Sequence, residues 1–370
     1  MDLPFPVQEV NEGAARLQVP EVPRRKGPGT AGPWPFYNPT MRVNRDLSAV
    51  VLAKWPRPLR SALDGLAACG AWGIRMQLET RLDRVAFNDR SDIAARLIRE
   101  NLRRNRIDGE VTAQEFVSHI QSHRYDFVDI DPFGPPTPFL GAFFKRASVG
   151  TGFGVTATDT AVLGGTYPEA CIRRYGARPL RCPQGPEIGL RILLGYCSAR
   201  AADSGNSIRP ILSFAAEHFL RVVGIVERRS RPSLSFVAYR EDEGFVQVRE
   251  GERDAIGPLW MGPLQDAALV RRLAPSEWTH PESARLLSTI QGEADLPPFF
   301  VTTDELASWE RGSPPKLTSF LEGLRDRGHR AARTHFHPRG IRTDAPYDEI
   351  LSVFRERMPS GSTGGSGPAS

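Results

Sequence analysis

Apolar and polar positions follow a strand-then-helix rhythm over the first 230 residues or so. Short apolar runs that end in a turn or an acid begin near residues 61, 84, 110, 125 and 152. Amphipathic stretches follow the first three runs, and this alternation predicts an α/β sheet of parallel strands. A long helix expected over 186–202 precedes two nearly adjacent strands, 208–217 and 219–228.

A parallel sheet that closes with an antiparallel hairpin is the layout of class I S-adenosylmethionine methyltransferases, a Rossmann-like α/β fold. We expect this domain over residues 1–227. A smaller C-terminal α/β domain is expected over 228–358, where LSFVAYR and FVQVRE alternate as paired strands do. Helices are expected in DAALVRRLAP, PESARLLSTIQ and LTSFLEGLRDRG. The Gly/Ser-rich residues 359–370 predict a disordered tail.

The most informative apolar run is YDFVDIDPFGPP, which ends in Asp131, Pro132 and Phe133. At the carboxyl edge of a parallel sheet, such a corner can accept hydrogen bonds from an exocyclic amine and stack on its ring. The alternative is an Asx turn that only closes the strand. Taken alone, the corner does not decide between these roles.

The upstream runs favour a nucleotide-like ligand. Asp64 ends a short strand and is followed by a small-residue turn with Gly70 and Gly73, whose spacing departs from the G-x-G-x-x-G dinucleotide pattern. Asp89 ends the next strand, where a carboxylate suits a ribose diol. A cap on the following helix is the alternative for Asp89, and the two roles are compatible.

Several longer segments carry a family resemblance. They are FYNPTMRVNRDLS, NDRSD, DIDPFG, TATDTAVLGGTYPEACIRRYG, GPLWMGPLQD and RTHFHPRGIRTDAP. Together, and in this order, they resemble the tRNA (guanine-26, N2) dimethyltransferase family from about residue 9 to about residue 351. The resemblance implies an enzyme that transfers one or two methyl groups from S-adenosylmethionine to N2 of guanine 26 in tRNA.

The resemblance also implies roles for particular residues. Arg45 and Arg75 would face the methionine carboxylate of the cofactor, and Asp89 its ribose. Glu115 and Phe116 stand where the family usually carries an Asp-Ala pair near the adenine. The acid is kept there, while its neighbour is larger.

For the target base, the resemblance implies a sandwich between Phe36 and Phe133. Asp131 and the Pro132 carbonyl would then engage the N2 amine. This amine is a weak nucleophile because its lone pair is delocalised, so orientation matters more than base strength. The bland alternative for Phe36 is core packing, but its proline-rich surroundings, PWPFYNP, favour a loop.

Composition agrees with an RNA partner. The 370 residues carry a formal net charge of +5 and a pI near 9.2, mostly from arginine. This excess suits phosphate contacts but is modest. No apolar stretch is long enough to cross a bilayer and no leader is evident, so we expect a cytoplasmic protein. No obligate protein partner is evident.

No metal is expected. The four cysteines, Cys69, Cys171, Cys182 and Cys197, contain no C-x-x-C pair. Many family members carry a cysteine cluster in the segment that corresponds to about 228–256, which this chain lacks, so we expect no structural zinc. His335 and His337 have no evident third ligand nearby, and a structural or RNA-contact role is favoured for them.

Two other functions stay open on the sequence. The DPFG corner is also similar to the Asp/Asn-Pro-Pro-aromatic motif of methyltransferases that act on other exocyclic amines. A noncatalytic tRNA-binding protein of the same fold is the other alternative. The sequence leaves undecided the extent of methylation, modification of guanine 27, the tRNA set, the oligomeric state and whether Asp159 caps a turn or borders the base pocket.

Overall fold

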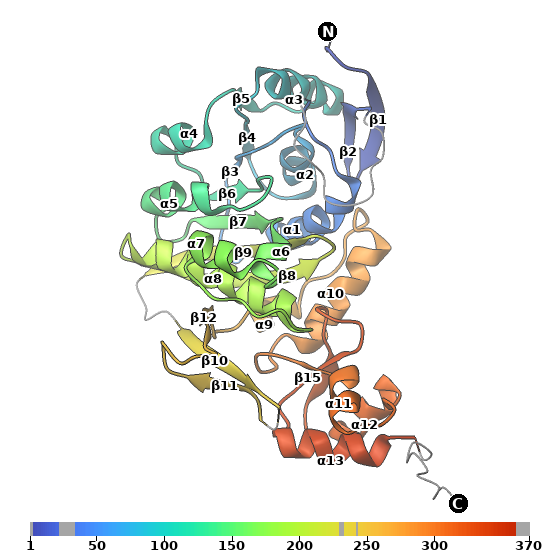
Figure 1. Cartoon of the computed structure of the whole chain (residues 1–370). Coiled ribbons are helices and arrows are strands. Elements are labelled where there is room, and N and C mark those ends of the chain that lie inside the picture. Colours follow the sequence, from blue (N-terminus) through green and yellow to red (C-terminus); the bar gives the residue numbers. More distant parts are fainter. Residues whose placement is uncertain (1–2, 22–33, 229–232, 242, 360–370) are drawn as a thin grey trace, which may run out of the picture.

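A mixed seven-stranded sheet is the largest sheet among the described residues (Figure 1). The computed structural model describes residues 3–21, 34–228, 233–241 and 243–359. The strands, in the order β5-β4-β3-β6-β7-β9-β8, are β3 (Ser61–Asp64), β4 (Arg84–Asn88), β5 (Glu110–Thr112), β6 (Phe127–Ile130), β7 (Gly152–Ala157), β8 (Asn206–Ala216) and β9 (Phe219–Arg228). Strands β3 to β7 pair in parallel, whereas β9 is antiparallel to both β7 and β8. The predicted methyltransferase-type sheet with a terminal hairpin is confirmed.

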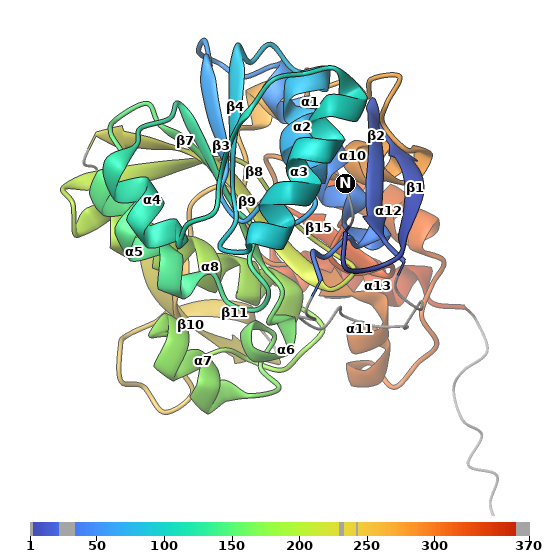
Figure 2. The ribbon, with the colours of Figure 1, turned by 90° about the horizontal axis from the view of Figure 1, so that it is seen from above.

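Helices cover both faces of this sheet (Figure 2). One face carries α1 (Arg42–Ala53), α2 (Ala71–Glu79) and α3 (Asp92–Asn105), and the other carries α4 (Phe116–Ser122), α5 (Thr137–Arg146) and α8 (Gly185–Ala202). Two separate apolar cores therefore form, one on each side of the strands. The strands are almost continuously apolar because both of their faces are buried.

The glycines of the predicted nucleotide turn serve packing. Gly70 has φ of +78° at the start of α2, a conformation that costs glycine little. A Cβ at Gly73 would lie 2.2 Å from the Phe87 ring, so glycine lets α2 approach β4 closely. Both glycines set the position of α2 against its neighbours.

An N-terminal hairpin was not anticipated. Strands β1 (Val7–Glu12) and β2 (Ala15–Pro20) pair antiparallel and lie against α3. The Asn101 side chain bonds both the N–H and the C=O of Gln18, at 2.7 and 2.9 Å. The side-chain amide of Asn101, on α3, thus satisfies backbone groups at the free edge of β2. The sequence of neither segment indicates this pairing.

Two small sheets follow the main one in the chain. Their orders are β11-β10-β12, with β10 (Leu234–Arg240), β11 (Gly244–Val248) and β12 (Ile256–Trp260), and β13-β15-β14, with β13 (Val301–Thr302), β14 (Ala331–Arg333) and β15 (Gly340–Thr343). The accompanying helices are α9 (Ala267–Val270), α10 (Pro281–Glu293), α11 (Thr303–Trp309), α12 (Leu317–Asp326) and α13 (Tyr347–Arg357). The predicted pairing of LSFVAYR with FVQVRE is confirmed.

The helix predicted in DAALVRRLAP is much shorter than expected. It ends at Val270, after which the chain turns. The Gln291 side chain donates to the carbonyls of Val270 and Leu273, at 3.0 and 2.8 Å. A side chain from α10 therefore satisfies carbonyls that a longer helix would have bonded.

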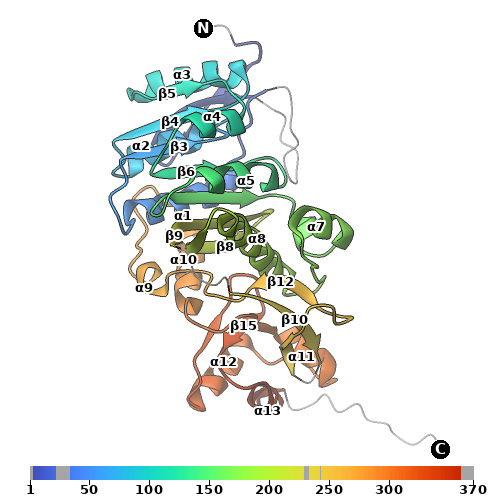
Figure 3. The same cartoon turned by 90° about the vertical axis from the view of Figure 1, so that its left-hand side faces the viewer.

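Apolar packing runs across the predicted boundary at residue 228. Residues of α9 and α10 join the core beneath α1 and α2, and residues of β10 and β12 join the core around α8. Among the described residues, only the apolar cluster formed by α11, α12, α13 and their strands is separate. Figure 3 shows the resulting elongated molecule, with the main sheet at one end and α13 at the other. The division into independent domains stays a prediction, and the tail from residue 360 lies outside the described residues.

A buried ionic network joins α8 to the C-terminal elements. Glu187 is fully buried and accepts from Arg191 at 2.8 Å and from Arg342 at 2.8 Å. Arg342 also bonds Glu293 at 2.8 Å. Burial alone would raise the pKa of Glu187, but the two guanidinium groups lower it below its ordinary value. The carboxylate is therefore charged and compensates two buried cations.

Removing Glu187 should destabilise the fold strongly. In Glu187→Ala, Arg191 and Arg342 lose their shared counter-charge in a water-poor site, and the expected loss is about 3–5 kcal/mol of unfolding free energy. Urea unfolding at pH 7 would measure it. As a control, Asp326→Ala removes an exposed partner of Arg357, and its expected effect is below about 1 kcal/mol. Similar losses of unfolding free energy in the two variants would contradict the conclusion that burial makes the Glu187 network important for stability.

Candidate active site

A cavity of about 640 Å³ lies at the carboxyl edge of the parallel strands. Residues that follow β3, β4, β6 and β7 reach it together, as expected where parallel strands end at one edge. Every predicted cofactor or catalytic residue except Arg75 lines it: Phe36, Arg45, Asp64, Asp89, Glu115, Phe116, Asp131, Pro132 and Phe133. The fold thus brings together side chains that lie up to about a hundred positions apart.

The corner after β6 is held by Thr158, which follows the neighbouring strand β7. The Gly134 N–H donates to Thr158 Oγ1 at 2.7 Å, and the Thr158 N–H donates to the Gly134 carbonyl at 3.1 Å. Gly134 has φ of +81°, which favours glycine. The Gly134 amide and carbonyl are therefore both satisfied by Thr158, and Asp131 lines the cavity.

The acidity of Asp131 is shifted by its surroundings. Burial raises its pKa to about 6, and the nearby Asp129 adds to the rise, while Arg221 and Thr156 oppose it. Asp129 is itself buried and bonded to Arg221 at 2.5 Å. Asp64, at the end of β3, also has a pKa raised well above its ordinary value, by burial and then by Asp129. Asp131 therefore loses its negative charge as the pH falls through about 6.

Phe36 and Phe133 contact each other. Their ring centroids are 4.7 Å apart and the planes are inclined by 65°. A base stacked between two parallel rings needs them roughly 7 Å apart, twice a van der Waals contact of about 3.5 Å. Phe36 lies in an irregular segment and Phe133 is 48% exposed. Entry of a base between the rings therefore requires one of them to move.

Arg45 is positioned by a residue that the sequence did not indicate. Glu12, at the end of β1, accepts from Arg45 Nε at 2.5 Å and from Arg45 Nη2 at 2.6 Å. The Tyr37 hydroxyl donates to the same carboxylate at 2.7 Å. Although burial opposes ionisation, the charge of Arg45 and these hydrogen bonds lower the pKa of Glu12 to about 2. Nothing in the N-terminal sequence marks Glu12 as part of this site.

Arg75 lies behind the cavity wall. Its guanidinium is fully buried and bonds Glu79 at 2.7 Å, Asp46 at 2.7 Å and Glu12 at 3.1 Å. Asp46 in turn accepts from the Ser283 hydroxyl of α10 at 2.6 Å. Arg75 therefore binds carboxylates of the protein, and these hold the hairpin, α1, α2 and α10 together.

Asp89 lines the cavity, but Ser91 rather than Asp89 is the N-cap residue of α3, and the Ser91 side chain accepts from the Ala94 N–H. The Asp89 carboxylate accepts from the N–H groups of Ala68 and Ser91, at 3.0 and 2.9 Å. These bonds fix the loop after β3 and the start of α3. Glu115 is exposed, whereas Phe116 is 1% exposed and packs edge-on against Phe139. Phe116 thus supplies an apolar part of the wall.

Asp159 takes neither of the roles considered for it. It precedes the short helix α6 (Thr160–Leu163) without a side-chain capping bond. Instead it accepts from the Tyr175 hydroxyl at 2.8 Å and from Arg174 at 3.2 Å. Both partners belong to α7 (Pro168–Tyr175). Asp159 therefore fastens α7 beside the site.

The lining also includes residues that the sequence did not single out. They are contributed by the segment before α1, by α2 and by the β8–β9 turn, and include Tyr37, Asn38, Trp72, His218 and Phe219. Among the described residues, no group of three or more His, Cys, Asp or Glu side chains is placed to hold a metal ion. Nor do the described helices include one that is long and apolar enough to cross a membrane.

The sheet topology and a cavity at its carboxyl edge define a class I S-adenosylmethionine-dependent methyltransferase fold. The N2,N2-dimethylguanosine tRNA methyltransferase family matches residues 13–355, so this chain belongs to that family.

Relatives match over nearly the whole chain. The tRNA (guanine(26)-N(2))-dimethyltransferase of Thermococcus kodakarensis is 35% identical over 378 residues, which cover 94% of this chain and 98% of the relative. The enzyme of the same name from Methanospirillum hungatei is 36% identical over 374 residues, covering 95% and 98%. The solved structure of Trm1 from Pyrococcus horikoshii with S-adenosyl-L-methionine has a TM-score of 0.83 at 32% identity, covering 94% of this chain and 99% of that one.

The low pKa of Glu12 predicts an acid-sensitive contribution to stability. A carboxyl whose pKa falls from about 4.5 to about 2 on folding stabilises the protein fully above pH 4.5 and loses that contribution as the pH falls toward 2. At pH 3 the expected loss is about 2 kcal/mol relative to pH 6. Glu12→Gln should show a correspondingly smaller decrease in unfolding free energy between pH 6 and pH 3.

Urea titrations at the two pH values would measure this difference. Glu349→Gln provides the control, because its partner Arg327 lies at the surface and the carboxyl is 40% exposed. The assignment fails if Glu12→Gln is as sensitive to acid as the unmodified protein.

Proposed function

We propose that this protein transfers methyl groups from S-adenosylmethionine to N2 of guanine 26 in tRNA. The observation that carries the proposal is the corner Asp131-Pro132-Phe133, which opens into the same cavity as Arg45 and Asp89. An acceptor for an amine, a ring for stacking and polar residues suited to a charged nucleoside cofactor thus face one space. Membership of the family supports guanine N2 as the target.

The residues present fit the cofactor. Arg45 Nη1 makes no hydrogen bond to the described residues, so it is available to a carboxylate, and Glu12 holds the rest of the guanidinium. The carboxylate of Asp89 faces the cavity and suits a ribose diol. Phe116 offers an apolar surface for the adenine. When bound, S-adenosylmethionine supplies the electrophilic methyl group carried on its sulfonium.

Arg75 acts in this proposal as a positioning residue. Its bonds to Glu12 and Asp46 hold the two elements from which Arg45 and Glu12 project. The methionine carboxylate is therefore assigned to Arg45, with Arg75 behind it.

The protein's own groups orient the acceptor amine. The Asp131 carboxylate and the Pro132 carbonyl accept hydrogen bonds from the two amine protons, which raises electron density at nitrogen and directs its lone pair. Phe133 stacks on the extracted base, and Phe36 moves to cover the other face; this stacking offsets part of the unstacking cost. Asp131, with a pKa of about 6, then accepts the proton that the amine loses.

The remaining parts of the proposal concern the surroundings of the reaction. The C-terminal elements, α9 to α13 and their strands, hold the tRNA body, and the reaction takes place in the cytoplasm. Whether the product carries one methyl or two depends on the room beside Asp131 once the first methyl is attached. Nucleoside mass spectrometry of an unmodified tRNA transcript after reaction gives both the modified position, including any change at guanine 27, and the extent.

Asp131→Ala should lose at least about a hundredfold in methylation rate, because the amine is no longer oriented and the proton has no acceptor. Binding of S-adenosylmethionine, measured by calorimetry, should stay within about twofold. Asp83→Ala, an exposed aspartate before β4, serves as the control and should methylate normally. Turnover by Asp131→Ala at the normal rate would refute the proposed mechanism.

Activity should fall in mild acid. Asp131 has a pKa near 6 and must be ionised to accept hydrogen bonds from the amine, so kcat/KM should drop about tenfold per pH unit below pH 6. The reaction would be followed from pH 5 to pH 8 with the tRNA concentration well below KM. Cofactor binding measured over the same range separates this effect from loss of the folded state. A profile that is flat across the range would remove Asp131 from this role.

A further inference from the structure

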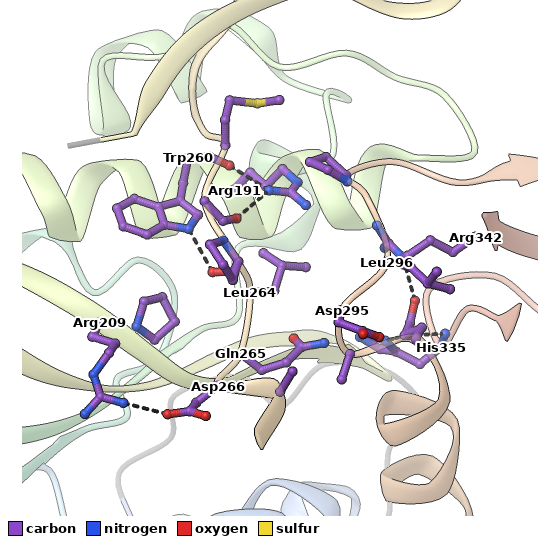
Figure 4. Close-up of a pocket in the computed structure, with 18 of the residues that line it drawn as sticks. Arg191, Arg209, Trp260, Leu264, Gln265, Asp266, Asp295, Leu296, His335 and Arg342 are labelled. Atoms are coloured by element: carbon purple, nitrogen blue, oxygen red, sulfur yellow. Dashed lines mark hydrogen bonds and ion pairs between the residues drawn. The ribbon is translucent and has the colours of Figure 1, made fainter. Parts of the chain in front are cut away.

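A second cavity lies on the other side of β8, between the main sheet and the C-terminal elements (Figure 4). Its volume is about 640 Å³, as large as the first and within the range of small-molecule sites. Its lining includes the segment GPLWMGPLQD from Trp260 onward, and His335, Phe336 and Arg342 of RTHFHPRGIRTDAP. Neither segment contributes to the first cavity.

The charged groups around this second cavity are already paired. Arg191 and Arg342 share Glu187, and Arg209 bonds both Glu227 and Asp266 at 2.7 Å. His335 bonds Glu293 through Nδ1, and its Nε2 accepts from the backbone N–H of Ala215. Because these charges satisfy one another, a ligand inside has no unpaired ion to bind. The cavity therefore suits a neutral molecule.

One buried polar group in the lining has no partner. Gln265 is 5% exposed, and its Oε1 accepts no hydrogen bond among the described residues. Figure 4 shows its side chain between Asp266 and Asp295, with no interaction drawn to it. A buried amide oxygen without a donor costs about 1–3 kcal/mol, which a bound ligand with an N–H donor would recover.

The rest of the wall suits a flat ring. Ile208, Pro210, Leu264, Leu296 and Phe336 give it apolar and aromatic surfaces. A nucleobase is planar and neutral, and its edge carries a donor beside an acceptor. That edge matches the oxygen and nitrogen of a glutamine amide.

Two exposed arginines bond Asp295, one of the residues that line the cavity. Asp295 accepts from both Arg271 and Arg330, at 2.5 and 2.9 Å. Arg330 also bonds Asp344 at 2.7 Å, so the two arginines and the two carboxylates balance in formal charge. Both arginine side chains are at least half exposed, so their bonds are weak enough to exchange for phosphate oxygens.

We propose that the second cavity binds a nucleobase of the bound tRNA, with its edge hydrogen-bonded to the amide of Gln265. The claim that the base belongs to tRNA rests on the proposed function. The claim that the site binds a nucleobase does not. The site lies beside β8 and away from the methyl-transfer corner, so it anchors the tRNA without taking part in the reaction.

Two binding measurements test the site separately from catalysis. Saturation-transfer NMR with adenosine, guanosine, cytidine and uridine is recorded with saturating S-adenosylhomocysteine, which occupies the cofactor part of the first cavity. The signal that is lost in the Gln265 variant then reports binding in the second cavity. Filter binding measures the affinity for an unmodified tRNA transcript. Gln265→Leu should weaken the best nucleoside and the tRNA about tenfold, and it should leave kcat at saturating tRNA unchanged.

Matched variants distinguish binding from folding. Gln265→Leu should not lower Tm, because the replaced oxygen has no partner to lose. Gln8→Leu makes the same change at an exposed position of β1, and it should leave both affinities unchanged. Ala267→Phe fills the cavity from another lining residue and should weaken both ligands without removing the amide.

The outcomes separate the claims. Weaker binding of both the nucleoside and the tRNA in the two cavity variants supports the proposed site. If the protein then fails to methylate tRNA, only the proposed function is refuted. Loss of nucleoside affinity with unchanged tRNA affinity overturns the RNA source and identifies a free nucleoside as the ligand. No nucleoside binding together with unchanged tRNA affinity in both cavity variants overturns the site altogether.

Discussion

The ion pair of Asp129 with Arg221 joins the parallel part of the sheet to its antiparallel hairpin. Asp129 projects from β6 and Arg221 from β9, and both are 1% exposed. They meet over Gly154 of the intervening strand β7, where a Cβ would lie 2.1 Å from Asp129 and 2.4 Å from Arg221. The glycine is required because any side chain there would separate the charges.

This ion pair also affects the pKa of Asp131, two residues after Asp129 in the chain. Asp129 contributes to the raised pKa of both Asp64 and Asp131, and Arg221 limits the rise at Asp131. A carboxyl with a pKa near 6 is mostly ionised at neutral pH yet remains a better proton acceptor than an ordinary aspartate. The same bond thus stabilises the sheet junction and adjusts the acidity of the proposed catalytic residue.

Two further buried networks have the same composition, with carboxylates shared between arginines. Glu12 connects Arg45 to Arg75 beside the first cavity, and Glu187 connects Arg191 to Arg342 beside the second. Each network joins elements that lie far apart in the chain. Arginine suits this arrangement because its planar group can bond two acceptors at once. Similar ionic networks therefore support the walls of the two cavities. The first cavity retains an available guanidinium, that of Arg45, whereas the second offers a neutral amide, that of Gln265.

Much of the main sheet was predictable because the sequence signals of its strands and helices lie within short segments of the chain. The apolar runs, their acidic ends and the helix at Ala71–Glu79 depend on nearest neighbours, and parallel strands end at one edge whatever the sequence between them. The residues of the proposed site could thus be named in advance, from Asp131 and Asp89 and from the family resemblance. The capping box of Thr302 with Glu305 is likewise a local signal, because the two residues are three positions apart in the chain.

Other features arise only from tertiary contacts. Glu12 and the β1–β2 hairpin depend on partners in α1 and α3, and the short α9 depends on Gln291 of α10. The sequence by itself determined which acidic and aromatic residues stand at the end of which strand. Tertiary structure decided which charges neutralise one another and placed Arg75 behind the cavity wall. It also left Oε1 of Gln265 without a hydrogen-bond donor among the described residues. Such pairings depend on distances across the fold, which side-chain periodicity along the chain does not encode.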